Sequence, residues 1–316
     1  MLKFAPRRIP VMTMSAKADS LKTVLYALGA NFAIFVSKLV AAMFTGSGAM
    51  LAEAIHSLAD CGNQALLLIG MRQAKRPATA DYPLGYGKAI FFWSFLVALM
   101  LLSVGGLFSL YEGWHKLHHP EPLKMPWLAV AVLVFGIVAE SLSMRACLVE
   151  VNKVREGRSL YRWFRESRQA EMVVIFGEDL AALLGLTFAL VAIALTMATG
   201  NPMYDALGTL GIGLLLIVVA AFVAREVKAM LIGQSAEPAT RDAIRAFVEN
   251  RPEIKRIFSL ITLQLGNDIM VAVQAEMADT DVSTAQTLLV INAIEADMRA
   301  KFPEVRWSFF EPDDSE

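Results

Sequence analysis

The chain has 316 residues, of which 56% are hydrophobic and 19% are charged. A soluble globular domain has about 45–50% apolar residues even with glycine counted, so this composition argues against a soluble enzyme. The 29 basic and 30 acidic residues give a net charge of -1, which argues against a nucleic-acid-binding protein. The two cysteines, Cys61 and Cys147, are too few for a disulfide framework.

Six apolar stretches are long enough to cross a membrane. A bilayer core about 30 Å thick is spanned by roughly 20 apolar residues in a helix. The sequence therefore predicts an α-helical membrane protein with six transmembrane helices, and the lipid bilayer as its surroundings. In chain order the predicted spans are residues 23–44, 49–70, 89–110, 127–146, 172–196 and 207–222.

Basic residues set the expected orientation. Residues 1–22 are rich in basic residues: the first 18 alone carry Lys3, Arg7, Arg8 and Lys17, and no acid. We interpret them as a cytoplasmic N-terminal segment, with an organellar targeting peptide as the alternative. Further basic residues follow the second and fourth spans, whereas the links after the first and fifth have none. The positive-inside rule then places both termini in the cytoplasm. We expect a bacterial inner membrane, with an organellar membrane as the alternative.

The pattern changes after residue 233. We predict a helix over 238–250, strands over 257–265 and 269–277, a helix over 282–302 and a strand over 305–310. Gly266, Asn267 and Asp268 provide the turn between the first two strands. Residues 23–233 would thus form the transmembrane domain, and 234–316 a small cytoplasmic α+β domain of the ferredoxin or metallochaperone kind. Because so small a domain has a limited core, we expect a partner copy to support it.

Acidic residues fall inside the predicted spans. The second span contains Glu53, His56 and Asp60, and the last two are four residues apart, so they share one helix face. Glu140 lies near the middle of the fourth span, and Glu178 and Asp179 near the middle of the fifth. An ionised group at the bilayer centre costs about 2.5–3.5 kcal/mol. Since Lys38 is the one Lys or Arg within the six spans apart from Arg145 at the end of the fourth, internal salt bridges cannot balance these acids, and a bound cation is favoured.

The types of residue indicate a divalent transition metal as substrate. A histidine with several carboxylates suits Zn²⁺, which takes four ligands in a tetrahedron, and Mn²⁺, Co²⁺ or Fe²⁺ as alternatives. The candidate ligands are His56, Asp60 and Asp179, with Glu178 or Glu140. Because these groups lose protons to bind metal, metal binding is coupled to proton release, as an antiporter requires. We expect Glu53, close to the start of its span, to be hydrated, and Lys38 to face the bundle or snorkel.

At this point the sequence resembles a known family. Thr45-Gly-Ser-Gly-Ala-Met-Leu-Ala-Glu-Ala-Ile-His-Ser-Leu-Ala-Asp60, the six spans and the α+β tail are similar to the cation diffusion facilitator family. Glu-Asp-Leu-Ala-Ala-Leu-Leu-Gly at 178–185 and Gly-Asn-Pro-Met-Tyr-Asp-Ala-Leu-Gly at 200–208 resemble its divergent branch, which includes the mitochondrial zinc-transporter-like proteins. The resemblance implies a homodimeric divalent-cation/proton antiporter. Its first, second, fourth and fifth helices would enclose the site, and its tail would dimerise.

The resemblance carries over to the candidate ligands in part. His56 and Asp60 fall on the family's second-helix ligand positions, and Asp179 on its fifth-helix aspartate. The family's fifth-helix histidine would fall at position 175, where this chain has Ile175. Glu178 or Glu140 is therefore the candidate for the missing ligand.

Other family positions differ here as well. Tyr82 and Tyr86 stand where histidines are common in the loop after the second helix, and the tail has no His or Cys, so we expect no further zinc site of the usual kind in either place. Asp205 matches a family aspartate, although an acid is favoured near a helix N-terminus in any case.

Two functions of other classes compete with transport. An intramembrane metal-dependent enzyme could use the same ligands with an open position for water, but no additional nucleophile or acid–base pair accompanies them. A non-transporting scaffold or regulator with a vestigial metal site is the other alternative. We predict a metal cation/proton antiporter rather than an enzyme.

Overall fold

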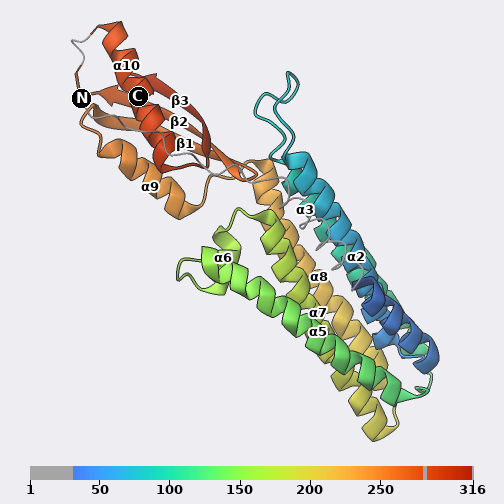
Figure 1. Cartoon of the computed structure of the whole chain (residues 1–316). Coiled ribbons are helices and arrows are strands. Elements are labelled where there is room, and N and C mark those ends of the chain that lie inside the picture. The colour runs from blue at the N-terminus through green and yellow to red at the C-terminus, as the bar shows by residue number, and fades with distance from the viewer. Residues whose placement is uncertain (1–30, 280–282, 315–316) are drawn as a thin grey trace, which may run out of the picture.

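The computed structural model describes residues 31–279 and 283–314. A bundle of long helices carries a small sheet domain at one end (Figure 1). The expected cytoplasmic segment 1–22, the first residues of the first predicted span and Val282 lie outside the described residues.

Within the described residues, four helices are long and apolar enough to cross a membrane. They are Ala89–His118, Pro126–Val154 (α5), Ala170–Thr199 (α7) and Met203–Ile232 (α8). The first of these consists of α3 (Ala89–Met100), a π-helical segment η1 (Leu101–Leu107) and α4 (Phe108–His118). They contain the third to sixth predicted spans. The π-helical segment was not predicted, because hydrophobic periodicity does not distinguish it from an α-helix.

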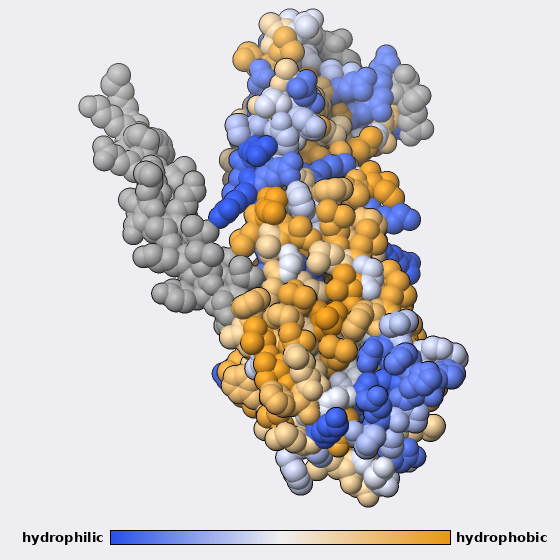
Figure 2. Space-filling model, turned by 90° about the vertical axis from the view of Figure 1, so that its right-hand side faces the viewer, coloured by the Kyte–Doolittle hydropathy of each residue, from blue (hydrophilic) through white to orange (hydrophobic). Residues whose placement is uncertain are grey.

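Two further helices complete the bundle, an apolar helix Asn31–Thr45 and α2 (Gly48–Ala74). The polar residues of α2 lower its hydropathy, and those residues include Glu53 and the two predicted ligands His56 and Asp60. Figure 2 shows a hydrophobic surface along the helical part, with hydrophilic residues gathered toward its ends.

Asp205 ties the bundle together at the end away from the sheet domain, which we call the far end. Its carboxylate accepts hydrogen bonds from Ser47 Oγ at 2.5 Å and from the backbone nitrogens of Gly48 and Ala49 at 2.8 and 3.4 Å. The acid lies in the first turn of α8 but also caps the N-terminus of α2. Asp205 is therefore buried because it caps α2, and not because of its position in α8.

The sheet domain has the predicted order of elements. These are α9 (Pro238–Glu249), β1 (Ile254–Leu265), β2 (Asp268–Met277), α10 (Thr284–Lys301) and β3 (Val305–Pro312). The strand order is β1-β2-β3, with β1 antiparallel and β3 parallel to β2. Ser283 caps α10 through a reciprocal capping box with Gln286, which fixes where that helix begins.

The two faces of the sheet differ. Ile269, Val271, Val273 and Ala275 alternate along β2 and are buried in a core with α9 and α10. On the other face, Ile261 of β1, Ala272 of β2 and Phe309 of β3 are paired in register across the sheet. Ile261 and Phe309 are 57% and 55% exposed. One sheet face thus carries an apolar row that no described element covers.

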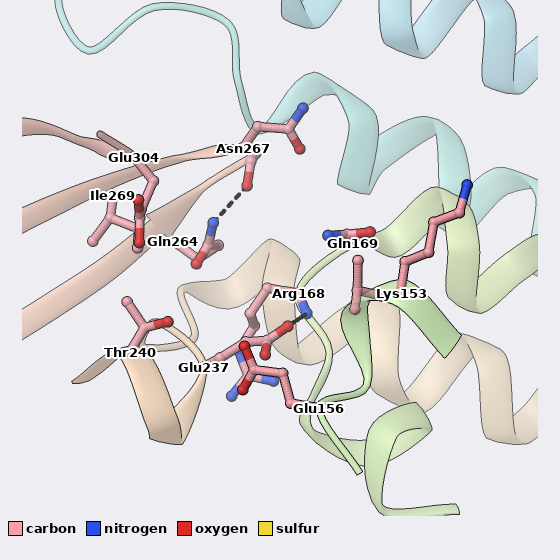
Figure 3. A pocket seen from close by; sticks show the side chains of 12 residues that line it. Lys153, Glu156, Arg168, Gln169, Glu237, Thr240, Gln264, Asn267, Ile269 and Glu304 are labelled. Carbon is pink, nitrogen blue, oxygen red and sulfur yellow. Dashed lines mark hydrogen bonds between the residues drawn. The ribbon is translucent and has the colours of Figure 1, made fainter. Parts of the chain in front are cut away.

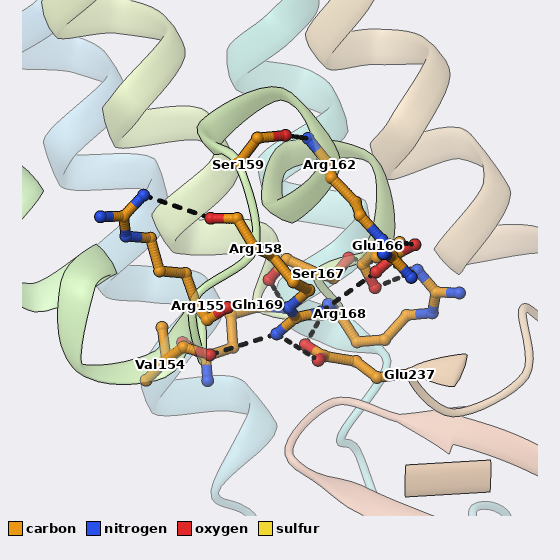
Figure 4. Close-up of polar contacts among 10 residues, drawn as sticks. All are labelled: Val154, Arg155, Arg158, Ser159, Arg162, Glu166, Ser167, Arg168, Gln169 and Glu237. Atoms are coloured by element: carbon orange, nitrogen blue, oxygen red, sulfur yellow. Dashed lines mark hydrogen bonds and ion pairs between the residues drawn. The ribbon is translucent and has the colours of Figure 1, made fainter. Parts of the chain in front are cut away.

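The sheet domain meets the bundle through a polar junction (Figure 4). Arg158 and Arg168 come from the link between α5 and α7, which contains an unpredicted short helix α6 (Leu160–Glu166). Arg158 Nη2 donates to Glu237 Oε2 at 3.1 Å, and Arg168 Nε donates to the Ser235 carbonyl at 2.8 Å. Hydrogen bonds from Arg162 and Arg158 hold the pKa of the Glu166 carboxyl below its ordinary value.

A polar pocket of about 380 Å³ lies beside this junction (Figure 3). Lys153 and Arg168 reach it from the helical part, and Gln264 and Glu304 from the sheet domain. Nearby, Gly87 and Gly266 bring their backbones so close that a Cβ at either would collide with the other segment. The sheet domain is therefore seated on the links between helices.

Candidate functional site

A cavity of about 70 Å³ lies between four helices of the bundle. They are the helix Asn31–Thr45, α2, α5 and α7, the same four that the family resemblance implies. The lining residues are Asn31, Ile34, Asp60, Gln64, Ala139, Glu140, Ser143, Glu178, Asp179 and Ala182.

The cavity brings together four of the five predicted ligands. Asp60 comes from α2, Glu140 from α5, and the neighbouring Glu178 and Asp179 from α7. Glu178 is buried, whereas Asp60, Glu140 and Asp179 are partly exposed. Of the described residues that line the cavity, none is basic. A concentration of carboxylates with no opposing charge among its lining residues is suited to receiving a cation.

The fifth predicted ligand, His56, lies beside the cavity rather than in its lining. Its Nδ1 atom is 3.6 Å from Asp60 Oδ1, which is too long for a hydrogen bond. In the described part of the chain, neither ring nitrogen has a hydrogen-bond partner, although the side chain is buried. Asp60 Oδ1 is likewise without one. A buried imidazole and carboxylate with unused lone pairs are chemically competent to bind a metal.

The π-helical segment η1 borders His56. A Cβ added at Gly105 would lie 3.9 Å from His56 Nδ1, in ordinary contact. Single-turn π segments often occur at functional sites. This backbone irregularity therefore lies beside the imidazole, in the helix that packs on α2.

Two hydrogen-bonding residues were missed by the sequence analysis. Asn63 Nδ2 donates to Glu178 Oε1 at 2.6 Å, and Ser143 Oγ donates to the two Asp179 oxygens at 3.3 and 3.2 Å. Their spacing provides a signal, because Asn63 lies three residues after Asp60 and Ser143 three after Glu140. Polar residues one helical turn from an intramembrane acid face the same side.

The expectation that Glu53 is hydrated is wrong. Its side chain is fully buried, and Lys38 Nζ lies 3.2 Å from Glu53 Oε2 and donates to Ser57 Oγ at 2.8 Å. Lys38 therefore faces the bundle and does not snorkel. The position of Glu53 near the start of α2 did not reveal its burial, because the cap by Asp205 places that end of the helix inside the protein.

The carboxylates are gathered but do not yet surround one point. Among the described residues, no three His, Cys, Asp or Glu side chains converge closely enough to hold a single ion. Ile175, at the position of the family's histidine, is 39% exposed and does not line the cavity. Like charges close together repel one another, so convergence of these acids needs a cation or protons between them.

Comparison with known proteins identifies the family of the chain. Residues 24–232 match the family described as the cation efflux transmembrane domain. The chain belongs to the cation efflux family. It is therefore a multi-pass membrane protein, and the resemblance to cation diffusion facilitators is confirmed.

Its relatives in the cation efflux family carry transporter names. The mitochondrial proton-coupled zinc antiporter SLC30A9 of Xenopus laevis is 35% identical over 250 residues, which cover 78% of this chain and 44% of that protein. Metal tolerance protein C4 of Arabidopsis thaliana is 29% identical over 76% of this chain and 53% of its own length. The cation-efflux pump FieF of Serratia proteamaculans is 27% identical over 85% of both chains. The chain thus spans less than half the length of SLC30A9, and most of FieF.

Proposed function

We propose that this protein is an antiporter that exchanges a divalent metal cation, Zn²⁺ in the first place, for protons. The observation that carries the proposal is the cavity between four membrane helices, lined by Asp60, Glu140, Glu178 and Asp179 with no basic lining residue among those described. Carboxylates in such a place are neutralised by protons or by a cation. Exchange of one for the other is the chemistry of an antiporter.

The metal would be held by His56, Asp60 and Asp179. Glu178 is our first choice for the remaining ligand, because it is buried beside Asp179, and Glu140 is the second. Asn63 and Ser143 now occupy oxygens of Glu178 and Asp179. When a cation neutralises the acids, a small movement of α5 and α7 toward α2 would bring the ligands to one point.

Proton coupling follows from the same ligands. Zn²⁺ requires a neutral imidazole nitrogen and ionised carboxylates, so its binding displaces protons, and protons in turn displace the metal. The names of the relatives support both the ion and the coupling, because SLC30A9 is called a proton-coupled zinc antiporter and FieF a cation-efflux pump. Mn²⁺, Co²⁺ and Fe²⁺ are alternative substrates for so carboxylate-rich a site.

We further propose six transmembrane spans in a domain over residues 23–233, and a cytoplasmic domain over 234–316. The helix Asn31–Thr45 and α2 would be the first two spans. Basic residues in the links at the sheet-domain end support a cytoplasmic location for that end and for both termini. The bacterial inner membrane is our first choice and an organellar membrane the second, since FieF comes from a bacterium and SLC30A9 is named a mitochondrial protein.

A homodimer is proposed from the open face of the sheet. Ile261, Ala272 and Phe309 form a row of apolar side chains on that face, opposite the packed core. Pairing with a second copy would cover them. In the membrane, the dimer would be anchored by the other two long helices, which are the helix made of α3, η1 and α4, and the helix α8. The four site helices would rock against this anchor between inward-open and outward-open states.

Transport into proteoliposomes tests the proposal. Zn²⁺, Mn²⁺, Co²⁺ and Fe²⁺ uptake would be followed under an imposed proton gradient for wild type, Asp60→Ala, Asp179→Ala and Glu178→Ala. Asp297→Ala, which changes an exposed acid of the sheet domain, is the matched control. We expect uptake that collapses with the gradient and with Asp60 or Asp179, but not with the control.

A folded protein that moves none of the four metals would contradict transport. Metal binding without flux would then favour the scaffold or regulator. Uptake that persists in Asp60→Ala and Asp179→Ala would place the transport site elsewhere.

A further inference from the structure

Lys38 and Glu53 form a buried ion pair that the transport site does not use. Lys38 is 1% exposed and Glu53 is fully buried. Lys38 Nζ bridges Glu53 Oε2 at 3.2 Å and Ser57 Oγ at 2.8 Å, so it joins the helix Asn31–Thr45 to α2. A charged pair inside a membrane bundle carries a large desolvation cost, and such residues commonly mark ion pathways.

Along each of the four helices that surround the cavity, the residues at the ion pair lie closer to the far end than the residues that line the cavity. Lys38 is one turn beyond the lining residue Ile34, and Glu53 is two turns before Asp60 on α2. On α5, a Cβ added at Gly136 would lie 3.6 Å from Lys38 Cε, and Gly136 precedes Glu140 by one turn. On α7, a Cβ at Gly185 would collide with Glu53 Oε1, and Gly185 follows Ala182.

The absence of side chains at these two glycines therefore leaves space for the ion pair between the helices. A side chain at Gly185 would meet the Glu53 carboxylate directly, and one at Gly136 would meet the Lys38 stem and Leu186. Beyond this layer, toward the far end, the bundle is filled by a tightly packed core that includes Leu133, Leu186 and Ile193. The cavity has no lining residue in that region.

We infer that the Lys38–Glu53 pair is the far-side gate of the transporter. In the closed state, the Lys38 ammonium holds Glu53 and Ser57, and it blocks the route from the carboxylate cavity to the far end. Opening requires the helix Asn31–Thr45 to separate from α2, which parts the ammonium from the carboxylate.

The inference rests on the proposed transport function only in the identity of the ion that passes the gate. The gate itself is tested by accessibility, without metal and without a proton gradient. A single cysteine at the cavity position Ala139→Cys, in a Cys61→Ala, Cys147→Ala background, would react with a membrane-impermeant thiol reagent. Protease cleavage of the sheet domain reports the orientation of the protein in proteoliposomes.

Paired variants keep the buried charges balanced. Lys38→Met with Glu53→Gln removes both charges at similar volume, a change that folded proteins commonly tolerate. Lys38→Glu with Glu53→Lys reverses the pair. Glu150→Gln with Lys153→Met removes an exposed pair on α5 and is the control.

We expect the cysteine in the otherwise unchanged protein to react from the sheet-domain side only. In the neutral pair, labelling from the far side should rise about tenfold or more as the open population grows, whereas the reversed pair and the control should retain protection. The inference is overturned if the folded neutral pair stays protected, if the reversed pair is labelled as fast as the neutral one, or if the unchanged gate already admits the reagent from the far side. Loss of metal transport with intact gating would count against the proposed function and not against the gate.

Discussion

Acidic side chains in the sheet domain lie at the surface beside basic ones, whereas several in the helical bundle lie inside it. Glu276 pairs with Lys255 at 2.6 Å, and Asp297 with Arg251 at 2.8 Å, both within reach of water. None of the described acids of the sheet domain is buried, while Glu53 and Glu178 of the bundle are. Exposed pairs contribute little to stability and need no further explanation. Lys38 neutralises Glu53, and we propose that a transported cation or protons neutralise the acids of the cavity.

The largest contrast concerns one lysine in each region. Lys38→Met leaves Glu53 buried without its cation and should lower the free energy of unfolding by about 3–5 kcal/mol. Lys255→Met, which breaks the exposed pair with Glu276, should lower it by about 0–1 kcal/mol. Chemical unfolding in detergent measures both. Equal losses in the two variants would show that burial does not determine how much each pair contributes to the free energy of unfolding.

The next contrast concerns two serines of the bundle. Ser143 donates to Asp179, which we propose as a metal ligand. Ser143→Ala should therefore weaken Zn²⁺ transport at limiting metal about 10–100-fold, as removal of a partner of a metal ligand commonly does. Ser103 donates only to the Leu99 carbonyl of its own helix among the described contacts, and Ser103→Ala is the control. Transport kinetics in proteoliposomes decide this. If Ser143→Ala transports Zn²⁺ like wild type, the hydrogen bond from Ser143 does not orient Asp179 for metal binding.

A smaller contrast concerns two glycines. Gly185→Ala places a methyl group against Glu53 and should destabilise the protein by about 1–3 kcal/mol. A Cβ at Gly211 meets the Phe188 ring at 3.4 Å, an ordinary contact, so Gly211→Ala should be neutral or stabilising by up to about 1 kcal/mol. Unfolding in detergent compares them. If Gly185→Ala is as stable as Gly211→Ala, the ion pair is not tightly confined.

The smallest effect is a pH dependence at the junction. Hydrogen bonds from Arg162 and then Arg158 lower the pKa of Glu166 in the folded protein. A lowered pKa contributes stability at neutral pH, and this is lost as pH falls below the ordinary glutamate value of about 4.3. The Tm of wild type should therefore exceed that of Glu166→Gln at neutral pH, and the difference should shrink in acid. A difference that does not change with pH would contradict this origin.

Much of the fold could be predicted from the sequence, because it depends on patterns that local residues carry. Apolar stretches of sufficient length predicted the four clear membrane helices, and short strand-forming segments with the turn at Gly266, Asn267 and Asp268 predicted the strands of the sheet. The short helix α6 and the π-helical segment η1 were missed. The first is held by side-chain contacts such as that of Arg158 with Glu166, and the second keeps the same hydrophobic composition as an α-helix.

The candidate site could be predicted as a set of residues but not as a geometry. Intramembrane acids signalled Asp60, Glu140, Glu178 and Asp179, and these do line one cavity. The burial of Glu53 and its partner Lys38 could not be predicted, because it depends on how two helices meet. The roles of Asn63 and Ser143 also depend on contacts between helices far apart in sequence. Metal coordination by these residues remains a prediction.

Proton release on Zn²⁺ binding tests the central claim most directly. Zn²⁺ would be titrated into the detergent-solubilised protein in buffers of different ionisation enthalpy, for wild type and for Asp60→Asn with Asp179→Asn. If the cavity acids exchange protons for metal, Zn²⁺ binding to wild type releases protons, and the double variant loses both binding and release. Zn²⁺ binding that releases no protons, or that persists unchanged in the double variant, would contradict the account.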